Sequence, residues 1–114
     1  GCIILDCSEV TIGSNTLLGP NIGLYAANHS TDATERINGG CYGKPIHIGN
    51  NVWLGGDVKV LQGVTIGDNT IIGAGSIVTK DIPDNVIAVG NPCKVIRKIT
   101  EKDKTDYLER MGIK

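Results

Sequence analysis

Residues 48–78 read IGNNVWLGGDVKVLQGVTIGDNTIIGAGSIV and carry a strict six-residue repeat. Every sixth position holds an aliphatic residue, and the position two before it holds a small or β-branched one. A fixed period of this kind is typical of a solenoid, in which each repeat buries its apolar face against its neighbours. The aliphatic positions are Ile48, Leu54, Val60, Ile66, Ile72 and Val78.

The same phase extends towards the N-terminus, where Ile12, Leu18 and Leu24 occupy it. Glycine often follows the aliphatic residue, and Gly, Asn and Asp suit tight corners at which φ can be positive. We therefore expect short flat strands that each direct one aliphatic side chain inward. Three such strands make one triangular coil of about eighteen residues.

Two other β architectures fit the pattern less well. Parallel strands with right-handed crossovers need helices between them, and none can be placed between residues 8 and 83. An antiparallel meander or sandwich alternates with period two and turns every eight to twelve residues or so. The sequence therefore predicts an all-β fold, a left-handed parallel β-helix of hexapeptide repeats.

One polar segment interrupts the repeat. Residues 30–45 contain Gly39-Gly40 and end at Pro45, and the phase resumes at Ile48. We expect an extruded loop here, and loops longer than about 12–15 residues are often functional.

The repeat ends after Pro83, and Thr100–Met111 is predicted to form a short C-terminal α-helix. Thr100 suits its N-cap and Gly112 its end. A helix in this place would cover the open end of the solenoid. We therefore divide the chain into a β-helix domain, residues 1–98, and a C-terminal helix or tail, residues 99–114.

Composition excludes some classes of partner. The net charge is −1 and no broad basic stripe is present, so nucleic acid is not an expected partner. No apolar run approaches the roughly 18 residues of a membrane span, and no signal peptide pattern is found. These features predict a cytoplasmic location. The four cysteines could form two disulfides or stay as free thiols, and we expect free thiols.

The two histidines, His29 and His47, flank the loop. His29 lies where the regular coils stop, so its ring can project from the rigid wall into space beneath the loop. An imidazole with a pKa near ~6.5 can take a proton from a hydroxyl group at neutral pH. A surface histidine at a loop junction is the alternative. Two histidines cannot supply the three ligands of a catalytic zinc, so no metal requirement is expected.

Several motifs in fixed order closely resemble the maltose and galactoside O-acetyltransferases of the hexapeptide-repeat superfamily. The likeness covers nearly the whole chain and is most specific from Ile48 to Arg97. It rests on Asn28-His29 before a polar loop, Gly43-Lys44-Pro45, the runs 48–56, 63–69 and 73–83, and Gly90-Asn91-Pro92.

The resemblance implies an acetyl-CoA-dependent O-acetyltransferase acting on a hydroxyl of a sugar or similar acceptor. It implies that His29 is the general base in a ternary complex and that Asp6 binds the acceptor. Asp6 could instead cap a corner. The family is trimeric, with active sites between adjacent subunits, so a homotrimer is expected. The positions matching the acetyl-CoA site are Trp53, Gly56, Ala74, Thr79, Lys80, Lys94 and Arg97.

Two of these matches carry alternatives. Trp53 could pack on a neighbouring subunit instead of the cofactor. The family often has arginine at the position of Lys94, and lysine keeps the charge but loses the bidentate geometry.

Family members also carry an N-terminal segment with further acceptor-site residues, which is absent before Gly1. The acceptor therefore stays open among a maltose-like sugar, a polysaccharide or cell-envelope sugar, and an antibiotic hydroxyl. A non-catalytic β-helix interaction module or degenerate fragment is the alternative function.

Overall fold

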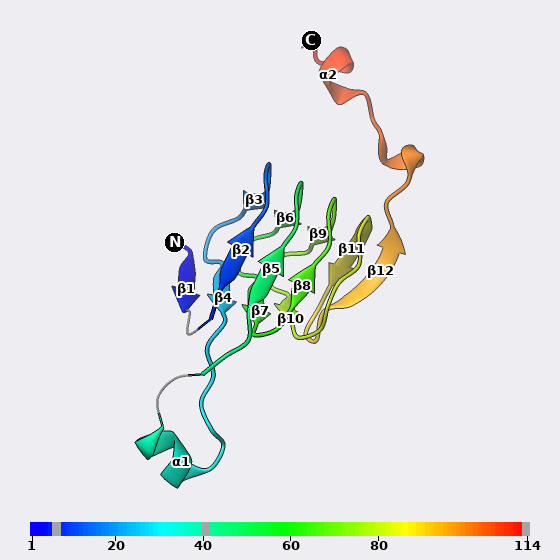
Figure 1. The fold of residues 1–114 in the computed structure, drawn as a ribbon. Helices are drawn as coiled ribbons and strands as arrows, with labels where there is room; N and C mark the ends of the chain where they lie inside the picture. The colour runs from blue at the N-terminus through cyan, green and yellow to red at the C-terminus, as the bar shows by residue number, and fades with distance from the viewer. Residues whose placement is uncertain (6–7, 40–41, 113–114) are drawn as a thin grey trace.

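The computed structural model describes residues 1–5, 8–39 and 42–112. In it, short parallel strands stack into three sheets that form the three faces of a prism. Figure 1 shows one face, β2, β5 and β8, side by side. Face A contains β1 (Ile3–Leu5), β4 (Gly23–Tyr25), β7 (Lys59–Leu61) and β10 (Ile77–Val78). Face B contains β2 (Val10–Ile12), β5 (Ile46–Ile48) and β8 (Thr65–Ile66). Face C contains β3 (Leu17–Leu18), β6 (Trp53–Leu54), β9 (Ile71–Ile72), β11 (Val86–Val89) and β12 (Lys94–Lys98).

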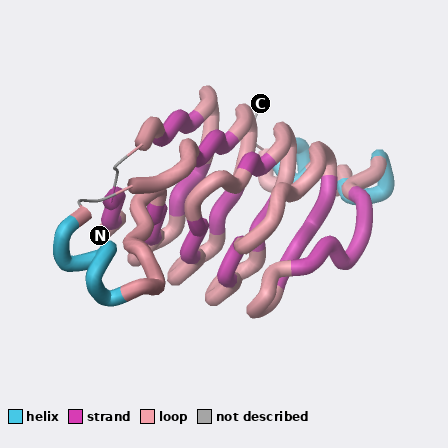
Figure 2. Tube along the Cα trace, turned by 60° about the horizontal axis from the view of Figure 1, so that its bottom comes forward, coloured by secondary structure: helices cyan, strands magenta, loops and turns pink. Residues whose placement is uncertain are grey.

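The register confirms the predicted parallel β-helix of hexapeptide repeats. Successive coils place equivalent residues 18 positions apart, as for Asn50 and Asp68. Across the loop the separation doubles to 36, as for Thr11 and His47, which are paired residues of β2 and β5. The loop therefore adds one coil's length of chain without shifting the inward phase. Figure 2 shows the coils as successive turns, with the loop helix at one end of the stack.

The core consists of the residues that the six-residue period predicts. The six aliphatic positions from Ile48 to Val78 are at most 3% exposed, and Thr70 and Ser76 are also buried. Full burial of a Val, Leu or Ile side chain contributes roughly 1.5–3 kcal/mol. The prediction is wrong for Ile12, which is 40% exposed, and Leu18 is only partly buried. Both belong to the first coils, which have fewer neighbours to cover them.

The glycines that follow the aliphatic residues serve a purpose other than the predicted one. Positive φ occurs three residues after the aliphatic position, as at Asn51 (57°), Asn69 (57°) and Gly75 (76°). Gly67 instead allows close approach, because a Cβ there would lie 2.6 Å from the backbone nitrogen of Asp84 in the next coil. Asn and Asp tolerate the left-handed region better than other side chains.

Asparagines at successive corners also join the coils to one another. The Nδ2 of Asn51 donates to the Oδ1 of Asn69 at 3.0 Å, and Asn69 donates likewise to Asn85 at 3.2 Å. One residue type thus supplies both the corner conformation and a side-chain hydrogen-bond ladder between coils.

The expected loop at residues 30–45 contains one short helix, α1 (Ala33–Asn38), in which no residue is buried. The carboxylate of Asp32 caps this helix by accepting a hydrogen bond from the backbone nitrogen of Glu35 at 2.9 Å. In Figure 1 the loop projects away from the prism.

The single terminal helix predicted over Thr100–Met111 is wrong in extent. The segment forms a 3₁₀ turn, η1 (Glu101–Asp103), and a short helix, α2 (Tyr107–Arg110). Thr100 does cap η1 in a capping box, but Asp106 has a φ of 48°, which stops a continuous helix. Neither element buries a residue, so they do not cover the end of the solenoid. No helix in the described part of the chain is long and apolar enough to cross a membrane.

Candidate active site

His29 lies at the neck of the loop, and backbone hydrogen bonds fix its place. Asn28 and Tyr42 form an antiparallel bridge in which Tyr42 donates its backbone N–H to the Asn28 carbonyl at 3.2 Å. The Tyr42 hydroxyl donates to the His29 carbonyl oxygen at 3.3 Å, and the His29 N–H donates to Asn28 Oδ1 at 2.8 Å. The His29 side chain is exposed. An imidazole held this way is open to a reactant.

The other predicted site residues lie on different parts of the prism. The loop leaves and returns at the edge between faces A and B, and Thr79 and Lys80 lie on the same edge, two coils further along. Gly56 and Ala74 lie on the edge between faces C and A. Because face A separates these two edges, one chain does not bring His29 together with Gly56 and Ala74.

Trp53 projects from face C. It pairs with Leu17 in β3 and Ile71 in β9, so the outward side chains of three neighbouring strands are apolar. Trp53 is 51% exposed and Leu17 is 65% exposed. Exposed apolar patches of this kind often contact a ligand or another protein.

The three predicted phosphate-binding side chains differ in their surroundings. Lys80 and Lys94 are exposed and form no ion pair with any residue that the structure describes. The Arg97 guanidinium instead donates to Asp103 Oδ1 at 2.7 Å and Oδ2 at 3.0 Å. These bonds, together with the Thr100 backbone N–H, lower the pKa of Asp103 to about 2, and the same pair raises the pKa of Arg97. A phosphate group that binds Arg97 must therefore share the guanidinium with Asp103 or displace Asp103 from it.

One predicted site residue, the four cysteines and the second histidine remain to be placed. Asp6, the expected acceptor ligand, lies outside the described residues, as do Cys7 and Cys41. Cys2 and Cys93 are free thiols. His47, whose role the sequence left open, lies on face B with its Nδ1 2.6 Å from the Thr11 hydroxyl.

Sequence reasoning missed a small cavity at Asn28, the residue before His29. It has a volume of about 140 Å³ and is lined by Tyr25, Ala27, Asn28, Leu61 and Gln62. The sequence did hold one signal, because Gln62 is the sole glutamine of the chain.

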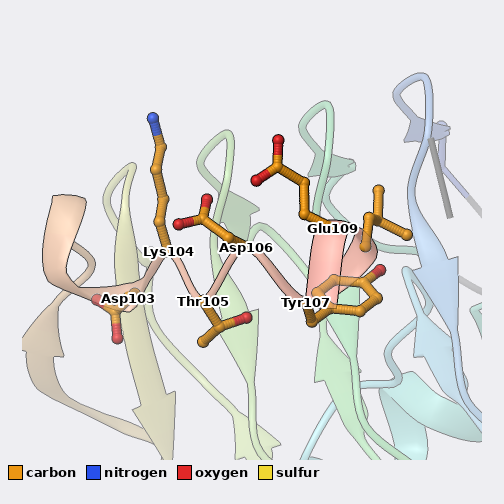
Figure 3. Close-up of a pocket in the computed structure, with 7 residues that line it drawn as sticks. Asp103, Lys104, Thr105, Asp106, Tyr107 and Glu109 are labelled. Atoms are coloured by element: carbon orange, nitrogen blue, oxygen red, sulfur yellow. The ribbon is translucent and has the colours of Figure 1, made fainter. Parts of the chain in front are cut away.

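A larger hollow, about 420 Å³, follows the C-terminal segment from Asp103 to Glu109. Figure 3 shows Lys104 and Glu109 pointing to the opposite side of this segment from Thr105. All of its lining residues are exposed and come from one continuous stretch, and none is a predicted site residue. Among the described residues, no cluster of three His, Cys, Asp or Glu could hold a metal ion.

Comparisons with known proteins identify relatives of this chain. Residues 45–80 match the family model for the bacterial transferase hexapeptide (six repeats). The galactoside O-acetyltransferase of Escherichia coli K12 is 55% identical over 106 residues, which cover 93% of this chain and 52% of that protein. A putative acetyltransferase of Saccharomyces cerevisiae is 55% identical over 103 residues, which cover 90% of this chain and 53% of that protein.

Solved structures of acetyltransferases share both the fold and much of the sequence of this chain. A maltose O-acetyltransferase from Clostridium difficile 630 superposes with a TM-score of 0.84 and 57% identity, covering 88% of this chain and 54% of that one. A galactoside acetyltransferase in complex with coenzyme A gives a TM-score of 0.85 and 55% identity, covering 90% and 51%. The chain thus spans about half the length of the proteins it matches. It belongs to the maltose and galactoside O-acetyltransferase family of hexapeptide-repeat proteins.

Proposed function

We propose that this chain is the β-helix region of an acetyl-CoA-dependent O-acetyltransferase that acetylates a hydroxyl of a sugar or similar acceptor. The supporting observation is an exposed imidazole, His29, held at the neck of a loop on a β-helix that is 55% identical to a galactoside acetyltransferase crystallised with coenzyme A. We also propose a cytoplasmic location, to be tested by cell fractionation.

In the proposed reaction, His29 removes the proton of the acceptor hydroxyl while that oxygen attacks the acetyl carbonyl carbon. The tetrahedral intermediate collapses, the C–S bond breaks, and the imidazolium returns its proton to the leaving thiolate. Backbone N–H groups near Gly56 are proposed to donate to the developing oxyanion. One such donor typically contributes about 2.7–4 kcal/mol to catalysis.

The remaining predicted residues are proposed to hold the two reactants. The pantetheine arm of acetyl-CoA would lie along Gly56, Ala74, Thr79 and Trp53. Asp6 would bind the acceptor. A Cβ at Gly56 would make only ordinary van der Waals contact with the Pro20 ring, at 3.4 Å, so packing within this chain does not by itself require glycine there.

Positive charge is proposed to bind the phosphates of acetyl-CoA. Lys80 and Lys94 are exposed and available for this role, whereas Arg97 is engaged with Asp103. Lysine attracts a phosphate as a point charge rather than by a bidentate fork.

The separation of His29 from Gly56 and Ala74 supports a homotrimer. If the C–A edge of one subunit faces the A–B edge of the next, each interface brings His29 of one subunit near Gly56 and Ala74 of the other. Such head-to-tail contacts close into a ring when the rotation is one-third of a turn. Sedimentation equilibrium is expected to give three times the chain mass, and a stable monomer at micromolar concentration would contradict the arrangement.

The activity is tested by following thiol release from acetyl-CoA with maltose and methyl galactoside as acceptors. His29→Ala is expected to lower turnover by about 10²- to 10⁴-fold, the usual contribution of a general base. Coenzyme A affinity, measured by isothermal titration, should stay within about twofold, because in this proposal the imidazole removes a proton and does not hold the cofactor.

His47→Ala is the matched control, because the other histidine lies on face B and contacts Thr11. It should retain wild-type turnover. Wild-type activity in His29→Ala would rule out the base assignment, and absence of saturable coenzyme A binding to the unmodified chain would rule out the proposed function.

A further inference from the structure

Gln62, one of the residues that line the cavity beneath the loop, has an unsatisfied polar atom. The Oε1 of Gln62 is buried and has no hydrogen-bond partner among the described residues. Leaving a buried carbonyl oxygen without a donor is unfavourable, and native structures rarely retain such an atom without a water or ligand to satisfy it. The Gln62 carboxamide therefore needs a hydrogen-bond donor that the described residues do not supply.

Equivalent positions in other coils show what Gln62 lacks. Asn50 and Asp68 occupy the same hexapeptide position, and each side chain accepts a hydrogen bond from a backbone N–H of the preceding coil, at 2.7 and 2.8 Å. At Gln62 the preceding coil is interrupted, because the chain leaves into the loop after Ala26 and returns at Lys44. The Gly63 N–H bonds to the Lys44 carbonyl at 3.2 Å, which closes the corner below the loop.

The cavity is therefore a product of the insertion, and it borders the residue that precedes the proposed base. Asn28, one of its lining residues, directly precedes His29 and accepts the His29 N–H. A volume of about 140 Å³ exceeds the roughly 30 Å³ that one water occupies in the liquid but is below the ~300–1,000 Å³ of a whole ligand pocket. This space fits one part of a larger ligand.

The lining also indicates the chemical class of that ligand. Tyr25, Ala27, Asn28, Leu61 and Gln62 carry no formal charge at neutral pH. A phosphate or carboxylate would find no cation here, whereas a neutral hydroxyl can donate to the amide oxygen of Gln62.

We infer that the Gln62 carboxamide accepts a hydrogen bond from a hydroxyl of the sugar acceptor, in a subsite beneath the neck of the loop. This inference rests on the proposed acetyltransferase function. Gln62 is then a positioning residue: it orients the acceptor beside His29 and takes no part in proton transfer.

The kinetic test compares Gln62→Leu with the wild type, using methyl galactoside and maltose as acceptors. Gln62→Leu keeps the approximate size and removes the amide. It is expected to raise the KM for the acceptor about 3- to 10-fold, as loss of one hydrogen bond does, with kcat and the KM for acetyl-CoA within about twofold. Its thermal midpoint should not fall, because the amide makes no bond within the described protein.

Asn50→Leu is the matched control from the same hexapeptide position. It loses the bond to the Ser14 N–H, so its thermal midpoint should fall while its acceptor KM stays at the wild-type value. An unchanged acceptor KM in Gln62→Leu would overturn the inference, and so would a lowered midpoint with no change in KM, which would show a structural role.

A binding measurement separates this inference from the proposed function. Because Gln62 is the sole glutamine, its side-chain N–H resonances can be identified by labelling glutamine alone with ¹⁵N. Saturable movement of these resonances with methyl galactoside or maltose supports the subsite, even if the wild type releases no thiol and the proposed function fails. Resonances that stay fixed at saturating acceptor overturn the subsite and leave the cavity to water.

Discussion

The glycines after the aliphatic positions provide a sharp test of how the coils pack, and Gly67→Ala is the most informative change. An ideal Cβ at Gly67 would lie 2.6 Å from the Asp84 nitrogen and 2.7 Å from the Pro83 carbonyl carbon. Non-bonded carbon contacts favour about 3.5–4.0 Å, so the next coil has to move away. The clash also involves the Asp84 carboxylate, which accepts the Asp68 N–H at 2.7 Å.

The magnitude follows from these two effects. Overpacking against backbone costs about 1–3 kcal/mol, and loss of the Asp68–Asp84 hydrogen bond costs about 0.5–1.5 kcal/mol more. Gly67→Ala should therefore destabilise the fold by about 2–4 kcal/mol. For a chain of about this size, 1 kcal/mol shifts the thermal midpoint by roughly 4–8 °C, so a fall of about 10 °C or more is expected.

Asparagine substitutions distinguish close packing from a need for positive φ. Gly75 has a φ of 76° and open space around its Cβ position, and it is in phase with Asn51 and Asn69. Gly75→Asn should therefore be nearly neutral, whereas Gly67→Asn should destabilise at least as much as Gly67→Ala. Both are measured by circular dichroism on heating at one protein concentration, because assembly makes the midpoint depend on concentration. A Gly67→Asn variant that melts within about 2 °C of the wild type would refute the packing argument.

The C-terminal ion pair, the proposed phosphate-binding lysine and the buried thiol give three further tests. The pKa of Asp103 is lowered to about 2. The contribution of the Arg97–Asp103 pair to stability is therefore complete above the usual carboxyl pKa of ~3.9 and is lost as the pH falls through about 2. Arg97→Gln should raise this pKa in a carboxyl NMR titration, and an unchanged value would show that Arg97 is not its cause. Lys94→Ala should raise the KM for acetyl-CoA several-fold with no change for the acceptor, and Lys94→Arg should restore it. Burial raises the pKa of the Cys93 thiol. A thiol reagent at pH 8 should therefore modify Cys93 much more slowly than exposed Cys2. Equal rates for the two thiols would contradict this prediction.

The sequence could predict the β-helix because its core uses one aliphatic residue per six-residue step. Each inward side chain between Ile48 and Val78 repeats the environment of the one before it, so the period alone determines which residues are buried. The period could not show that the first coils are partly uncovered, as at Ile12, or that Asp106 adopts a left-handed conformation within the predicted terminal helix. Both depend on what lies at an end of the stack, where the repeat no longer applies.

The candidate site was less predictable because its residues share no local pattern. His29 could be singled out as one of two histidines beside a loop, whereas Trp53 was found only through the resemblance to the family. The pairing of Arg97 with Asp103 could not be foreseen, since it depends on how the chain turns after β12. The cavity at Gln62 depends on the loop neck closing over a corner, and no spacing in the sequence encodes that closure.

The geometry of the loop neck would allow the proposed base to stay fixed while the proposed acceptor site differs between loops. The insertion keeps the register, since pairs across it are separated by 36 residues instead of 18, so the coils on both sides stay aligned. The Asn28–Tyr42 bridge closes the neck, and the free energy of loop closure rises only slowly with loop length. Changes within the loop can therefore reshape what lies above His29 without moving His29 itself. Gln62 lines the cavity beside this neck, so in the proposed enzyme it and His29 would keep their positions while different loops contact different sugars.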